Sequence, residues 1–97
     1  MIVEIVYKHE LDKQARKYIA KLDKPRQKLI IEGIEGLPRD GDIKPMRGYK
    51  NLYRLRVGGY RALYTLSEKI TYNEEKKQEE KIITVTVQTV DTRGDIY

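Results

Sequence analysis

Apolar and polar positions alternate between Leu52 and Leu66, where aromatic and aliphatic side chains are interleaved with arginines. This period of two is typical of β-strands, and the Gly58–Gly59 pair is a strong signal for a two-residue turn. The stretch therefore predicts a β-hairpin in which Val57 lies opposite Tyr60. One face of this hairpin would hold the residues Tyr53, Leu55, Val57, Tyr60, Ala62 and Tyr64.

The other face of the same hairpin would hold arginines. The register places Arg56 opposite Arg61, and Arg54 opposite Leu63. Like charges directly opposite each other on a sheet are destabilising, so we expect an anion to lie between Arg56 and Arg61. Phosphate is the obvious candidate for that anion.

The N-terminal third of the chain predicts a strand followed by two helices. Residues 2–7 alternate and are rich in β-branched side chains, as in a strand. Over residues 10–22 the apolar positions follow a helical period, opposite a side rich in lysine and arginine. A second helix is expected to begin near Asp23, with Pro25 in its first turn, and to end around residues 36–38. The two helices should form a helical hairpin that lies on the sheet.

The remaining segments predict a loop, a charged connection and a last strand. Residues 38–50 contain prolines and glycines and are expected to form a loop. Residues 67–80 are highly charged, which fits either an extended hairpin tip or a partly mobile loop. Residues 81–90 have the clearest strand pattern of the chain, and their apolar run implies burial on both faces over part of its length.

The composition limits the class of protein. Ninety-seven residues form a single domain, residues 1–97, that can bury a core without disulfides or metal. The absence of cysteine excludes a disulfide framework, and the spacing of the aspartates does not fit a metal site. The N-terminus lacks the pattern of a secretion signal, and no segment approaches the roughly 20 apolar residues that span a bilayer. We therefore expect a cytoplasmic protein that binds no metal and no cofactor.

The basic residues are concentrated in one part of the chain. Residues 38–61 hold seven basic residues against two aspartates, which equals the net charge of +5 of the whole chain. Such a stripe is expected of a protein that binds nucleic acid or another polyanion. A solvated basic face that awaits an acidic protein partner is the alternative, and the two interpretations are compatible.

The chemistry of RNA cleavage can be compared with the side chains that the chain offers. Without a metal, cleavage requires a base for the 2′-hydroxyl proton, cations for the charge on the phosphate and an acid for the 5′-oxygen. His9 is the only histidine, so a catalytic histidine pair is excluded. Arg61 is the best candidate for a phosphate clamp, and Arg54 and Arg56 would add charge beside it.

The C-terminal tail adds further candidate groups. Tyr97 could stack on a splayed base or take part in proton transfer. Arg93 would reach the leaving-group side if the tail runs next to the hairpin. Asp91 could act as a base, although a salt bridge to Arg93 or another arginine is its expected role.

Two motifs in the chain are specific. One runs from Arg54 to Tyr64 and has Arg-x-Arg before a Gly-Tyr-Arg turn, and the other is the Arg-x-acid-aliphatic-Tyr motif from Arg93 to Tyr97. Together with the order of elements they resemble the RelE/ParE superfamily of bacterial and archaeal toxins, over essentially the whole chain. The second motif is more typical of the RelE branch, whose members are ribosome-dependent endoribonucleases. The resemblance implies an α+β fold: an N-terminal strand, a helical hairpin and a three-stranded antiparallel meander that forms one sheet.

The resemblance also implies roles for single residues. Arg61 would be the transition-state stabiliser and Tyr97 the C-terminal aromatic residue of the site. The implied catalytic set is Arg54, Arg61, Arg93 and Tyr97. The chain departs from some relatives at Leu52, where they carry a basic residue. Lys50 and Arg47 are the nearest basic residues that could replace it. Both belong to the set expected to contact RNA, which is Arg47, Tyr49, Lys50 and Arg56.

This resemblance implies the toxin of a type II toxin–antitoxin system, a metal-independent endoribonuclease that cleaves mRNA on the ribosome and inhibits translation. Its expected partners are the ribosome, mRNA and a cognate protein antitoxin that masks the basic groove, with operator DNA bound only through the antitoxin complex. The alternative is a ParE-like toxin, which has the same fold, cleaves no RNA and inhibits DNA gyrase. A plain RNA-binding module is a third possibility.

Overall fold

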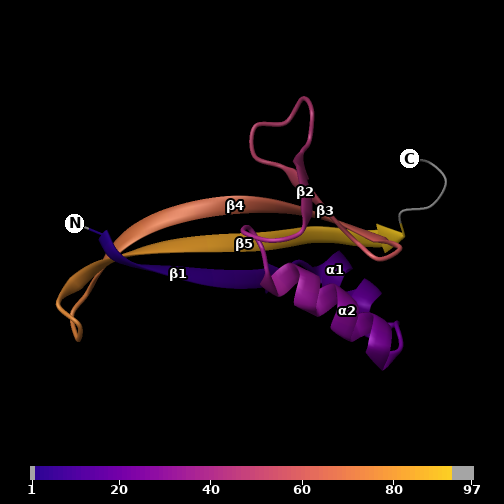
Figure 1. The fold of residues 1–97 in the computed structure, drawn as a ribbon, viewed down its shortest axis with the longest axis horizontal. Coiled ribbons are helices and arrows are strands. Elements are labelled where there is room, and N and C mark those ends of the chain that lie inside the picture. Colours follow the sequence, from indigo (N-terminus) through magenta and orange to yellow (C-terminus); the bar gives the residue numbers. More distant parts are fainter. Residues whose placement is uncertain (1, 93–97) are drawn as a thin grey trace.

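The computed structural model describes residues 2–92 of the chain (Figure 1). Its elements, in chain order, are β1 (Ile2–Leu11), α1 (Lys13–Ala20), α2 (Lys24–Glu35), β2 (Asp42–Pro45), β3 (Tyr53–Val57), β4 (Tyr60–Asn73) and β5 (Gln78–Thr92). The strands form one five-stranded sheet in the order β1-β5-β4-β3-β2. Figure 1 shows the helices near the end of the sheet that holds β2 and β3, whereas the β4–β5 hairpin projects beyond them. No helix in this part of the chain is long and apolar enough to cross a membrane.

The predicted architecture, with its strand, helical hairpin and three-stranded antiparallel meander, is wrong. The sheet has five strands and is mixed, because β1 runs parallel to β5. An additional edge strand, β2, lies within the segment that was expected to be a loop. Pro45 is compatible with this position, since an edge strand can include a residue that donates no ladder hydrogen bond.

The boundaries of the N-terminal elements also differ from the prediction. β1 continues to Leu11, opposite Val87 of β5, so the first helix begins at Lys13 instead of Glu10. Pairing with a neighbouring strand overrides the helical period of these residues. The start of α2 matches the prediction, because the Asp23 side chain accepts a hydrogen bond from the backbone N–H of Arg26 and proline occupies the first turn.

The charged segment 67–80 is the tip of a long hairpin, one of the two predicted alternatives. β4 continues to Asn73 and β5 begins at Gln78. In the turn between them, the Asn73 side chain accepts a hydrogen bond from the backbone N–H of Lys76. Cross-strand pairing therefore extends through most of the charged segment.

The register of the β3–β4 hairpin is confirmed. Val57 lies opposite Tyr60, and Arg56 lies opposite Arg61. Gly58 adopts a positive φ of 57°, which glycine tolerates in a tight turn. The predicted apolar face joins the core, whose buried members are Ala15, Ile19, Ile30, Ile34, Leu37, Leu55, Ala62, Tyr64, Val85, Val87 and Val90. The opposite face of this hairpin carries the arginines.

Candidate functional site

A row of four charged residues crosses four neighbouring strands on the arginine face. Asp42 of β2 lies opposite Arg56 of β3, Arg56 opposite Arg61 of β4, and Arg61 opposite Asp91 of β5. The two arginines are therefore flanked by aspartates of the chain itself. These carboxylates reduce the repulsion between the arginines, so the like-charge pair does not by itself require a phosphate.

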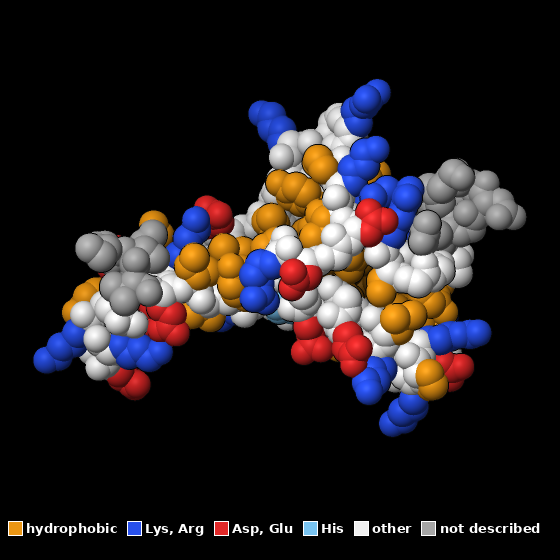
Figure 2. Space-filling model, viewed as in Figure 1, with side chains coloured by type: hydrophobic (Ala, Val, Ile, Leu, Met, Phe, Trp, Pro, Cys, Tyr) orange, Lys and Arg blue, Asp and Glu red, His pale blue; other side chains and the backbone are white. Residues whose placement is uncertain are grey.

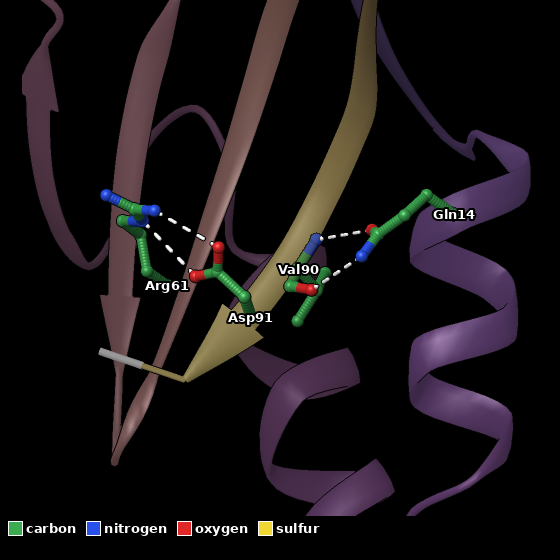
Figure 3. Close-up of polar contacts among 4 residues, drawn as sticks. All are labelled: Gln14, Arg61, Val90 and Asp91. Atoms are coloured by element: carbon green, nitrogen blue, oxygen red, sulfur yellow. Dashed lines mark hydrogen bonds and ion pairs between the residues drawn. The ribbon is translucent and has the colours of Figure 1, made fainter. Parts of the chain in front are cut away.

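Arg61 and Asp91 form a two-point ion pair (Figure 3). The Arg61 Nε donates to Asp91 Oδ1 at 3.3 Å, and its Nη2 donates to Oδ2 at 3.1 Å. The Arg61 side chain is 19% exposed and the Asp91 side chain 45% exposed. The expected salt bridge between Asp91 and an arginine is thus confirmed, with Arg61 as a partner.

An irregularity in β5 places Asp91 on this face. Leu63 pairs with Thr89, but the next residue of β4, Tyr64, pairs with Val87, so Gln88 is an extra residue in β5. Such a bulge reverses the alternation of the side chains that follow it. Val90 consequently joins the buried core, and the Asp91 side chain reaches the Arg61 guanidinium.

Gln14 of α1 supports the same end of β5. Its Nε2 donates to the carbonyl of Val90 at 3.1 Å, and its Oε1 accepts from the backbone N–H of Val90 at 2.9 Å (Figure 3). The pairing of β1 with β5 ends where Leu11 lies opposite Val87. Beyond that point the side-chain amide of Gln14 satisfies backbone groups that a longer strand would have satisfied. Nothing in the local sequence indicates this role, because the two partners are 76 residues apart.

Arg54 is the most buried of the three arginines on this face. It is 9% exposed, and its Nη2 donates to Asp42 Oδ1 at 3.3 Å. Its buried Nε has no hydrogen-bond partner among the described residues. A guanidinium that is held away from water and only partly compensated raises the positive potential around it.

A pocket of about 290 Å³ lies beside these arginines, and its lining residues are Lys44, Pro45, Met46, Arg47, Arg54 and Arg61. Four cationic side chains thus converge from β2, the loop that follows it, β3 and β4. Lys44 lies opposite Arg54 across the β2–β3 pair. Figure 2 shows Lys and Arg side chains gathered where β2, β3 and their connecting loop project from the body of the protein.

The structure brings some of the predicted site residues together and not others. Arg47, Arg54 and Arg61 line the pocket, together with Lys44, which the sequence did not single out. Tyr49 is 66% exposed in the β2–β3 loop, outside the pocket. Two further predicted residues do not line the pocket, namely Lys50 and Arg56. Arg93 and Tyr97 lie outside the described residues.

Two other ionisable groups have clear structural roles. The ring Nε2 of His9 lies 2.8 Å from the backbone carbonyl of Leu37, which fits a structural contact. Burial, followed by the phenol of Tyr53, raises the pKa of Tyr64 to about 12. Tyr64 is therefore protonated at neutral pH and cannot serve as a base.

Another hollow, of about 350 Å³, lies on the first helix and holds none of the predicted site residues. Its lining residues are Lys13, Arg16, Lys17 and Ala20. The cations of this hollow come from a single helix, whereas separate strands and a loop contribute the cations of the pocket beside Arg61. The candidate site is therefore the pocket beside Arg61, hereafter the arginine pocket.

The solved structures that share the fold of this chain include two from toxin–antitoxin complexes. A chain of the RelBE2 toxin–antitoxin complex from Mycobacterium tuberculosis is 24% identical, with a TM-score of 0.59, over 91% of this chain and 99% of that chain. A chain of the RelB–RelE antitoxin–toxin complex from Methanococcus jannaschii is 29% identical, with a TM-score of 0.55, over 91% of this chain and 94% of that chain. No protein-family model and no curated protein matches the chain.

Proposed function

We propose that this chain is the toxin of a type II toxin–antitoxin system and that it acts as a ribosome-dependent endoribonuclease of the RelE type. The proposal rests on the arginine pocket, where four cationic side chains from separate strands and a loop converge. It is supported by the fold, which the chain shares with chains of two RelBE complexes. A protein antitoxin and ribosome-bound mRNA are then its partners.

In this function the arginine pocket holds the scissile phosphate. Arg61 binds two phosphate oxygens through its guanidinium fork, while Lys44 and Arg47 add positive charge from the rim. Negative charge grows on these oxygens as the 2′-oxygen attacks, and cations that are already in place stabilise it. Arg54 contributes most effectively as a fixed charge, because its burial leaves little solvent to reorganise.

The proposed nuclease depends on the ribosome for positioning. The described residues that line the arginine pocket include no carboxylate and no imidazole, so this lining offers no general base of either kind. Precise alignment of the 2′-hydroxyl with the phosphate can replace a large part of the missing acid–base catalysis. By resemblance, Tyr97 is the C-terminal aromatic residue of the site, and Arg93 acts on the leaving-group side if the tail runs next to the hairpin.

Primer extension on a message in a reconstituted translation reaction tests this function. We would compare the native protein with Arg61→Ala and with a chain that lacks Tyr97, each with and without ribosomes. Loss of the clamp should slow cleavage by about 100-fold or more, as loss of a transition-state donor does in other enzymes. Arg26→Ala is the matched control, since it removes an exposed guanidinium on α2 and should leave cleavage unchanged.

The outcomes of this assay separate the two toxin classes. Cuts that need ribosomes and vanish with Arg61→Ala support the RelE-type nuclease. Intact message, in a preparation that still arrests growth, contradicts it and favours the ParE-like gyrase inhibitor. A gyrase cleavage assay on the same preparation then tests the inhibitor directly.

A further inference from the structure

We propose that Asp91 is a built-in competitor that sets the affinity of the arginine pocket for phosphate, a role that rests on the proposed function of the pocket. The Asp91 carboxylate occupies Arg61 in the absence of ligand, and an incoming phosphate must displace it. The protein therefore binds isolated RNA more weakly than its cationic pocket alone would allow.

The geometry of the ion pair carries this proposal. Asp91 engages Nε and Nη2 of Arg61 with its two oxygens, at 3.3 and 3.1 Å. That edge of a guanidinium is also one that matches two oxygens of a phosphate, so the two anions compete for the same donors. Asp91 is the more exposed partner, which makes the carboxylate the group that moves into water, while Arg61 stays at the pocket.

The backbone that carries this carboxylate is held in place by the fold. Val90, the residue before it, is fully buried, and both of its backbone polar groups are bound by the Gln14 amide. The extra residue Gln88 then turns the Asp91 side chain toward Arg61. A carboxylate on a backbone that is fixed in this way loses little conformational entropy on pairing, so it competes better than a carboxylate on a mobile loop.

Binding of a fluorescent single-stranded RNA with 2′-O-methyl riboses, followed by anisotropy, measures the competition without cleavage. Asp91→Asn should lower the Kd by about three- to tenfold, because charge-assisted pairing at a partly exposed site is being removed. Asp91→Ala leaves no side-chain oxygen for Arg61, so this variant should bind the RNA at least as tightly as Asp91→Asn does. Glu75→Gln, an equal charge change at the exposed β4–β5 turn, should change the Kd by less than about twofold.

A double-mutant cycle distinguishes competition from a general gain of positive charge. In an Arg61→Ala background, Asp91→Asn should change the Kd no more than the Glu75→Gln control does. Equal effects of Asp91→Asn with and without Arg61 overturn the proposal, as does an effect no larger than the control. A cooperative thermal transition in each variant establishes that the compared proteins are folded.

Inorganic phosphate serves as a second probe, through its effect on Tm. Stronger stabilisation of Asp91→Asn than of the native protein supports the competition independently of RNA. If phosphate shows this difference and no variant binds RNA, the role of Asp91 stands and the proposed nuclease function falls. If native protein binds RNA and Asp91→Asn changes neither readout, the nuclease function stands and the role of Asp91 falls.

Discussion

Replacing Gln14 with methionine should destabilise the protein more than its position on a short helix suggests. The substitution keeps a flexible side chain of similar length but removes two hydrogen bonds to the backbone of Val90, at 2.9 and 3.1 Å. Each such bond contributes about 1 kcal/mol, and a backbone group left without a partner adds to the loss when water cannot reach it. We therefore expect the free energy of unfolding to fall by about 2–3 kcal/mol.

Gln27→Met provides the matched control. The Gln27 amide donates its shorter hydrogen bond, of 3.0 Å, to the carbonyl of Ile19, and its side-chain oxygen accepts no hydrogen bond that the structure shows. That variant should lose about 1 kcal/mol. Urea unfolding followed by circular dichroism measures both variants, and the slopes should match the native slope if only stability has changed. A loss for Gln14→Met no greater than that for Gln27→Met would refute the view that Gln14 replaces a missing strand.

Three further predictions concern stability. Tyr64→Phe should reduce the loss of stability at alkaline pH. The folded-state pKa of Tyr64 is about 12, so the contribution of its protonated phenol to stability is present below pH 10 and is lost as the pH rises toward 12. Between pH 9 and 11 the native protein should lose about 1 kcal/mol more than the variant in urea unfolding, and equal losses would contradict this. Gly58→Ala should lower the free energy of unfolding by about 1–2 kcal/mol, because φ is 57° and the added Cβ would lie 2.8 Å from Leu29 Cδ2. An unchanged Tm would contradict the expected strain at this turn. Asp42→Ala should cost about 1–2 kcal/mol in the same assay, since it removes a carboxylate that accepts from the buried Arg54, and an effect below that of Asp40→Ala would count against this pairing.

The predictable parts of the fold are those that nearby residues specify. The β3–β4 register follows from the turn at Gly58 and from alternation on either side of it, so Arg56 and Arg61 were correctly placed opposite each other. The start of α2 follows from Asp23 and the proline after it. These signals operate within about ten residues, and no distant partner is needed to decide them.

The incorrect predictions share the opposite property. The helical pattern that begins at Glu10 was overridden because the end of β1 pairs with β5, far along the chain. β2 is only four residues long, and this segment is a strand only because it pairs with β3. The mixed topology of the sheet is likewise a result of pairing between segments whose local sequences do not identify each other.

For the candidate site, the sequence by itself determined which cations share a face: Arg54, Arg56 and Arg61 follow from strand period and turn. Only the tertiary structure decided which of them line a pocket and which carboxylates neutralise them. The pairing of Arg61 with Asp91 depends on a bulge in β5 and on a helix side chain that holds the same strand end. Alternation is encoded locally by backbone geometry, whereas a bulge and a contact across 76 residues arise only when the strands pack together.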